Sequence, residues 1–242
     1  ARLPIYVLLA GCFFGKYAMV AAFSMYVIGL VMAILVSLIV GKIDRAQAEN
    51  NLLIELPEYK RPNARTIGVY VWEKVKDYLT KAGTTIFVAS IVLWFLLNFN
   101  LHGLTEDVAQ SFGAMVGRLL VPVLAPAGLG MWQIGVALIS GISAKEVVVS
   151  SFSVLFGIGN INSAVGMAEM AQILEQSGFG ALNAYCLMLF CLLYVPCAAT
   201  IGTIRKETHS WKWTFGMIGF QLVLAWGVAL VVYQAGRIMG MG

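Results

Sequence analysis

The chain has 242 residues, of which 60% are hydrophobic and only 12% charged, and its formal net charge is +4 at pH 7. Soluble domains carry about a quarter charged residues, so this composition excludes a soluble globular protein and predicts an integral membrane protein. A small, scattered positive charge gives no indication of nucleic-acid binding, and it is better explained by the loop bias that orients membrane proteins.

Four stretches of the chain are apolar enough to predict membrane spans. A helix needs about 20 apolar residues to cross the hydrocarbon core. The stretches that meet or approach this length are residues 17–40, 82–98, 181–204 and 213–235. The predicted fold class is therefore an all-α integral membrane protein, a polytopic helical bundle that forms a single transmembrane transport domain over residues 1–242.

A fifth apolar stretch, residues 131–159, is interrupted at its centre by Lys145 and Glu146. Each arm has about a dozen residues, which is too short to span a bilayer alone. We predict a re-entrant helical hairpin with the two charged residues at its tip. A single span that carries an internal ion pair is the alternative.

The basic residues of the loops predict the orientation of the chain. Eight of the sixteen Lys and Arg residues lie in 41–81, and three more lie in 205–212, whereas 160–183 has none. Cytoplasmic loops carry the excess of Lys and Arg. We therefore expect 41–81 and 205–212 to be cytoplasmic, and 99–117 and 160–183 to be external.

Three connecting segments have recognisable patterns. Residues 72–79 and 104–119 repeat apolar side chains at helical spacing, which predicts amphipathic helices at the membrane interface, the second with Thr105 as its candidate cap. Residues 55–62 contain two prolines, which favour extended backbone. We expect this last stretch to be a strap on which cytoplasmic groups dock.

Lys145 and Glu146 form the first candidate site. Charged side chains inside a membrane are costly and usually mark an ion or substrate path. Glu146 could give a carboxylate to a cation, with Lys145 setting its charge state, and the small residues around Ser143 suit a hairpin tip. The alternative is that the two charges neutralise each other or reach the interface.

The second candidate site is Pro196-Cys197, in the middle of the apolar stretch 181–204. Proline removes a backbone donor and clashes with the preceding turn, so the helix must kink or unwind there. Unpaired carbonyls in a membrane must face a protein-lined cavity, and a thiolate beside them suits a soft metal ion. A kink with a buried thiol is the alternative.

The remaining residues around this break have predicted roles of their own. Tyr194 and Pro196 would form the hinge of the break, and Cys191 could line the same side of an irregular helix. Cys12 and Cys186 are expected to be packing residues. No cysteine lies in a loop, so no structural disulfide is expected.

Four patches in this order resemble the membrane part of the bacterial ferrous iron transport protein B family. They begin at Ala1-Arg2-Leu3-Pro4-Ile5-Tyr6, at Glu55-Leu56-Pro57, at Ala144-Lys145-Glu146 and at Leu193-Tyr194-Val195-Pro196-Cys197. The family has two gate motifs, each with a Pro-Cys pair. Residues 195–197 resemble the second gate, and the segment with Arg2 and Pro4 resembles the tail of the first, whose cysteine would precede Ala1. The resemblance therefore implies that the chain is part of a longer one.

The resemblance also implies a function. Fe²⁺ would be the transported ion, the protein would lie in the bacterial inner membrane, and two gates of opposite sense would form inverted repeats. The family's GTPase activity would reside in an N-terminal GTP-binding domain, and no Gly-x-x-x-x-Gly-Lys-Ser/Thr motif occurs here. This chain would thus be a transporter rather than an enzyme. Small cytoplasmic proteins of the same iron system and further copies of the chain are the expected partners.

Two other functions remain open from the residues. A carrier for a nucleoside or another organic solute would need hydrogen-bonding side chains in its cavity instead of thiols. A membrane assembly subunit without transport would pack Glu146 and Cys197 against protein, with no water path.

Overall fold

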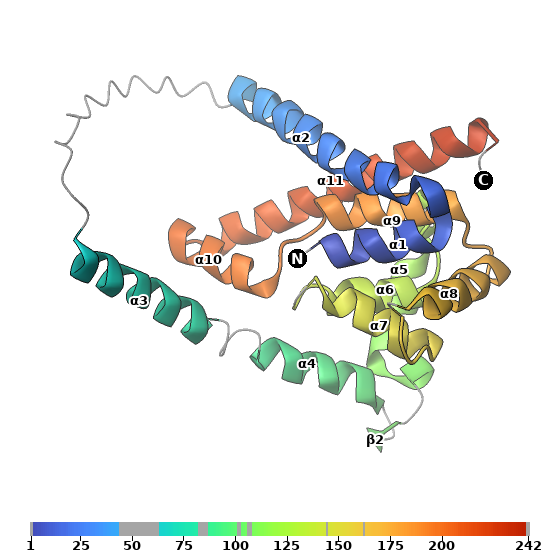
Figure 1. The fold of residues 1–242 in the computed structure, drawn as a ribbon, viewed down its shortest axis with the longest axis horizontal. Helices are drawn as coiled ribbons and strands as arrows, with labels where there is room; N and C mark the ends of the chain where they lie inside the picture. The colour runs from blue at the N-terminus through green and yellow to red at the C-terminus, as the bar shows by residue number, and fades with distance from the viewer. Residues whose placement is uncertain are drawn as a thin grey trace.

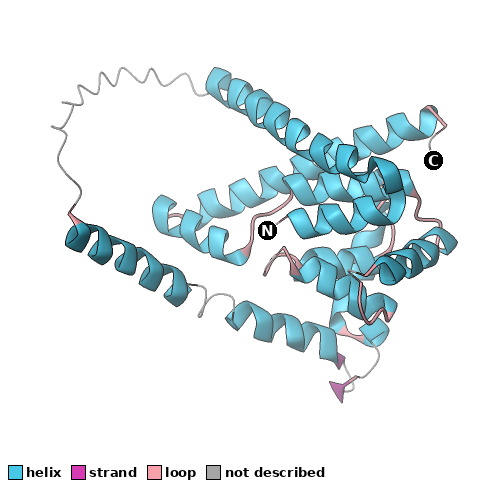
Figure 2. Cartoon of the chain, in the orientation of Figure 1, coloured by secondary structure: helices cyan, strands magenta, loops and turns pink. Residues whose placement is uncertain are grey.

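The structure is a computed structural model, and it describes residues 2–43, 63–81, 87–100, 103–105, 108–143, 145–161 and 163–240. The described part is almost entirely helical (Figures 1 and 2), which confirms the predicted all-α class. The helices are α1 (Leu3–Phe14), α2 (Ala18–Ile43), α3 (Ala64–Lys81), α4 (Phe87–Asn98), α5 (Phe112–Leu124), α6 (Trp132–Ser140), α7 (Val147–Phe156), α8 (Ala164–Gln176), α9 (Ala181–Leu193), α10 (Ala198–Thr208) and α11 (Trp211–Ile238).

Short elements connect these helices. Among the described residues, 3₁₀ turns lie at Gly15–Tyr17, Val108–Gln110 and Ala125–Ala127, and the two-residue strands β1 (Phe99–Asn100) and β2 (Gly103–Leu104) pair antiparallel. The predicted docking strap, 55–62, lies outside the described residues, as does much of the loop 41–81.

Helix α9 lies at the centre of the bundle. It packs against α11, α1 and α2, and a run of its side chains is buried: Ala184, Cys186, Leu187, Met188, Leu189, Phe190 and Cys191. A helix that is apolar on all sides must be surrounded by other helices or by lipid. Here protein surrounds its C-terminal half, and this half leads directly into the break at Pro196.

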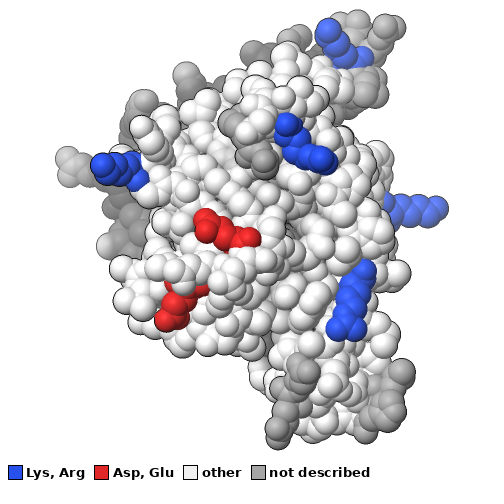
Figure 3. Space-filling view, turned by 90° about the vertical axis from the view of Figure 1, so that its right-hand side faces the viewer, with Lys and Arg blue, Asp and Glu red and all other residues white. Residues whose placement is uncertain are grey.

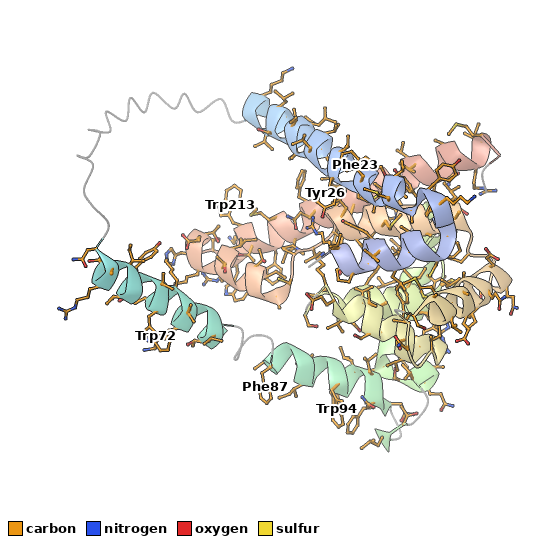
Figure 4. The ribbon with its side chains drawn as sticks, viewed as in Figure 1. Phe23, Tyr26, Trp72, Phe87, Trp94 and Trp213 are labelled. Atoms are coloured by element: carbon orange, nitrogen blue, oxygen red, sulfur yellow. The ribbon has the colours of Figure 1, made fainter. Side chains whose placement is uncertain are left out.

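The outer surface of the bundle is strongly apolar. Large side chains such as Phe23, Trp72, Phe87, Trp94 and Trp213 project away from their helices (Figure 4), each more than half exposed. One face of the molecule is mostly uncharged, with its acidic side chains gathered near the middle (Figure 3). A soluble protein rarely exposes so large an apolar surface, so lipid is its natural environment.

Two helical stretches are long and apolar enough to cross a membrane, and in the first of them the chain turns back between α1 and α2 (Figure 1). They are Leu3–Lys42, in which α1 leads through a 3₁₀ turn into α2, and Trp211–Ile238, which is α11. Two further spans are possible if each bent helix pair counts as one. The pairs are α5 with α6, bent by 105°, and α8 with α9, bent by 107°.

The predicted hairpin, 131–159, contains α6 and α7, joined by a tight turn around Gly141. Helix α6 packs against both α5 and α7. The tip of this pair is thereby directed at the break between α9 and α10, as described below. Its re-entrant path through the bilayer stays a prediction.

The helix predicted over 104–119 begins later than expected. Helix α5 starts at Phe112, and its cap is Ser111, whose Oγ accepts a hydrogen bond of 3.2 Å from the Ala114 N–H. The prediction of Thr105 as the cap was therefore wrong. An N-cap serine outcompetes the more distant threonine because its side chain reaches the exposed N–H groups of the first turn.

The predicted orientation can be tested with two exposed positions. A single cysteine at Gln172 on α8 is expected to react only from outside intact cells, and one at Lys206 on α10 only from the cytoplasm. The measurement is labelling by a membrane-impermeant maleimide before and after permeabilisation, in a protein without its native cysteines. Labelling of both positions from one side would contradict the predicted topology.

Candidate functional site at the broken helix

Proline is the local cause of the break between α9 and α10. Helix α9 ends at Leu193, although the Tyr194 N–H still donates to the Phe190 carbonyl at 2.8 Å. Pro196 has no N–H to continue the ladder and disfavours helical backbone at Val195. The chain runs extended through Tyr194 (ψ 178°) and Cys197 (ψ 158°) before α10 begins at Ala198. Cys197 is therefore the N-cap residue of α10.

The tip of the α6–α7 pair is joined to this break by two hydrogen bonds. The Ala198 N–H donates to the Ile142 carbonyl at 2.7 Å, and the Lys145 ammonium donates to the Val195 carbonyl at 2.8 Å. The Lys145 Nζ also lies 3.4 Å from the centroid of the Tyr194 ring. The two stretches singled out in the sequence thus meet at a single place.

A cavity of about 680 Å³ opens at the break. It is bounded by the start of α1, the middle of α2, the hairpin tip and both sides of the break. The lining residues are Arg2, Leu3, Tyr6, Met25, Tyr26, Gly29, Leu30, Lys145, Leu192, Pro196, Cys197 and Thr200. Segments distant in the sequence therefore build one partly polar chamber inside an apolar domain.

Several predicted site residues line this cavity. Cys197 and Pro196 come from the break, Lys145 from the hairpin tip and Arg2 from the start of α1. Tyr194 stands behind Lys145, in contact with its ammonium. The structure therefore brings together the two predicted sites and the tail of the predicted first gate.

Other predicted residues do not line the cavity. Glu146 is exposed at the start of α7, and Cys191 is fully buried in α9. Ser143 is buried, and its hydroxyl donates to the Ser140 carbonyl at 2.8 Å, which shapes the hairpin tip. Pro4 is exposed in the first turn of α1, where proline suits a helix start.

Four further cavity residues that could contact a ligand were not predicted from the sequence. The Thr200 hydroxyl lies 3.3 Å from Cys197 Sγ, one helical turn further along α10. Tyr6 is 3% exposed, and its hydroxyl has no hydrogen-bond partner among the described residues. Met25 adds a buried thioether, and Tyr26 a second phenol. Thr200 follows Cys197 by three residues, and this spacing on a helix could have indicated that the two side chains lie together. Nothing in the apolar sequence of α2 distinguishes Met25 from its neighbours.

The donor set determines what this chamber can hold. Within the described residues, no group of three or more His, Cys, Asp or Glu side chains could form a closed metal site. One thiol, several hydroxyl groups and a thioether remain, together with the cations Arg2 and Lys145. Such a set offers a soft or intermediate cation one thiol and several neutral donors, with no carboxylate among the lining residues.

A second cavity, of about 630 Å³, lies beside the first and is lined only by apolar and aromatic side chains. Phe190, Tyr194 and Val195 line it from the break, and Ile142 from the hairpin tip. Because Lys145 lines the polar cavity and touches the Tyr194 ring, this ring lies at the boundary between the two spaces.

Comparison with known families accounts for most of the chain. Residues 79–211 match the Gate family, described as nucleoside recognition, and they include the hairpin, the break and most of the lining of the apolar cavity. The chain belongs to the Gate family. Residues 22–74 match a second family, described as the C terminus of ferrous iron transport protein B. These matches confirm the resemblance predicted from the sequence.

Curated relatives extend the similarity to nearly the whole chain. An Fe(2+) transporter FeoB of Staphylococcus aureus (strain COL) is 39% identical over 98% of the chain, and one of Methanocaldococcus jannaschii is 37% identical over 99%. A fusion of Fe(2+) transport protein A with FeoB, from Porphyromonas gingivalis, is 32% identical over 98%. The chain spans about a third of the length of these relatives, 33–36%. No solved structure matches it.

Family and fold together define the cellular setting. The Gate match and the long apolar helices identify a multi-pass protein of the bacterial inner membrane. The cavity at the break is then a partly polar space within the helical part of this membrane protein.

Proposed function

We propose that the chain is the membrane permease part of an Fe²⁺ uptake system, and that the broken helix forms part of the ion's route. The observation that carries this proposal is the position of Cys197, a thiol beside a proline break that lines a partly polar cavity. The names of the relatives, all Fe(2+) transporters, support iron over the nucleoside or organic solute of the alternative.

Each predicted residue has a proposed role in this route. Fe²⁺ is intermediate in softness, so the Cys197 thiolate together with hydroxyl and carbonyl oxygens is a reasonable transient ligand set. Pro196 and Tyr194 form the hinge. Glu146, being exposed, would meet the ion outside the cavity, and Cys191 would contact it only if the hinge opens α9.

The coupling of transport to GTP and the binding of partner proteins are proposals for the full-length protein. We infer that a GTP-binding domain, N-terminal in the family, drives or regulates the permease, so that GTP acts through a domain other than this one. The fusion of Fe(2+) transport protein A to one relative supports a small partner protein of the same system. Association of several copies in the bilayer is a further proposal.

The proposal is tested by equilibrium binding of Fe²⁺ to the purified full-length protein under reducing, anaerobic conditions. Wild-type protein is expected to bind Fe²⁺, and Cys197→Ser to weaken binding by at least about tenfold, because a hydroxyl is a poorer ligand than a thiolate. Cys186→Ser, at a buried position away from the cavity, is the matched control. Binding of uridine instead of Fe²⁺, or equal Fe²⁺ affinity in both variants, would contradict the proposal.

A further inference from the structure

Lys145 is a buried basic side chain at the tip of the α6–α7 pair. Its side chain is 4% exposed, and no carboxylate forms a salt bridge with it among the described residues. Its ammonium is stabilised by the Val195 carbonyl at 2.8 Å and by the face of the Tyr194 ring at 3.4 Å. Burying an unpaired charge is costly, so these two contacts must replace most of its hydration.

Both contacts are made to the gate itself. Val195 directly precedes Pro196, and its carbonyl lies in the extended segment where no helix competes for it. A carbonyl oxygen and an aromatic face are groups that bind cations. The break therefore already holds a cation, which is supplied by the protein.

The Lys145 ammonium lies in the same cavity that the transported cation is proposed to enter. Lys145 and Cys197 line the same cavity, and Arg2 adds a second positive charge to its wall. Repulsion between like charges grows as the distance between them and the local dielectric constant fall, and Lys145 and an ion at Cys197 would share one cavity between apolar helices. A divalent ion next to Cys197 would therefore weaken the hold of Lys145 on the break.

We propose that the Lys145 ammonium is an internal competitor of the transported cation, which holds the break closed when the cavity is empty and is displaced when the ion enters. This inference rests on the proposed function, because it takes a divalent cation as the cargo. Lys145 thereby acts as a positioning residue of the gate: it sets the affinity for the ion without being one of its ligands.

The apolar cavity leaves space into which the Tyr194 ring could move. The Tyr194 hydroxyl has no hydrogen-bond partner among the described residues, so packing and the Lys145 ammonium hold this ring in place. The ring borders the apolar cavity of about 630 Å³. When Lys145 withdraws, the ring can shift into that space, and the Val195 carbonyl becomes available to the ion.

The test compares Lys145→Met with Lys145→Arg in the full-length protein in lipid nanodiscs. Methionine is unbranched and of similar length but uncharged, whereas arginine keeps the charge. We expect Lys145→Met to bind Fe²⁺ at least about tenfold more tightly, which is about 1.4 kcal/mol, and Lys145→Arg, which keeps the charge, to show no such gain. Mn²⁺ and Zn²⁺ affinities are expected to rise by a similar factor, because the repulsion depends on charge and not on ligand softness.

Uptake provides the second readout. An ion that binds more tightly leaves more slowly, so both the half-saturating Fe²⁺ concentration and the maximal rate of Lys145→Met should fall. A merely structural defect would lower the maximal rate without lowering the half-saturating concentration. If Lys145→Met does not accumulate in the membrane, Lys145→Gln is the substitute, with the same expected signs.

The outcomes separate this inference from the proposed function. If wild-type protein binds no Fe²⁺, the proposed function is wrong. If wild-type protein binds Fe²⁺ and the uncharged variant binds it equally or less tightly, the competitor role of Lys145 is wrong. A change in preference among Fe²⁺, Mn²⁺ and Zn²⁺ would also overturn it, because Lys145 would then shape the ligand set.

Discussion

Replacing Gly117 by valine is expected to destabilise the protein severely, because α5 and α6 meet through their backbones at this residue. A Cβ added at Gly117 would lie 2.7 Å from the Trp132 carbonyl oxygen and 2.9 Å from Val136 Cγ2. The facing residue on α6 is Gly135, where an added Cβ would lie 3.1 Å from the Gly117 Cα. Small residues allow such close crossings of membrane helices, and a carbonyl cannot rotate away as a side chain can.

The measurement is the Tm of the purified protein in detergent, together with its abundance in the membrane. Overpacking costs about 1–3 kcal/mol even where side chains can adjust, and the obstacle here is backbone, so little folded protein should remain. Gly219→Val on α11 is the matched control, since an added Cβ there meets nothing within 4 Å. An equal loss in both variants would show that valine itself, and not the crossing, is responsible.

This crossing also affects the candidate site. Helix α6 leads to the hairpin tip, where Ile142 and Lys145 bond to the broken helix. A displaced α6 would move both contacts, so partly folded Gly117 variants are expected to lose uptake as well as stability.

Local chemistry explains which parts of this arrangement could be predicted from the sequence. The long apolar runs of α2 and α11 are sufficient to predict helices, because a membrane helix satisfies all its backbone groups internally. The break at Pro196 follows from the missing N–H alone. The lone charges of the hairpin tip stand out because the membrane interior makes them costly.

The partners across the cavity could not be predicted, because they depend on packing between distant segments. Lys145 was paired in the sequence with its neighbour Glu146, but it bonds to Val195, fifty positions away. Successive residues on a helical turn point in different directions, so adjacency was a poor guide. Helix α2 is apolar on all sides, so its sequence does not indicate that Met25 faces the cavity.

Cys197→Ala is expected to remove most Fe²⁺ uptake by the full-length protein, whereas Cys186→Ala is expected to leave it nearly unchanged. Both changes replace a thiol by a methyl group. Cys197 lines the cavity at the N-cap position of α10, while Cys186 is fully buried within α9. The measurement is initial uptake of radioactive Fe²⁺ by cells under reducing conditions, normalised to the amount of protein in the membrane.

Thiol chemistry gives an independent check on the same residue, because exposed thiols react sooner than buried ones. A membrane-permeant maleimide should modify Cys197 well before Cys186 or Cys191, both of which are fully buried. Fe²⁺ should slow the reaction at Cys197, because a metal-bound thiolate is unavailable as a nucleophile. If Fe²⁺ protects no thiol and Cys197→Ala transports normally, the proline break is a kink retained for packing. The ion would then cross the membrane by a route that avoids the cavity between α1, α2 and the hairpin tip.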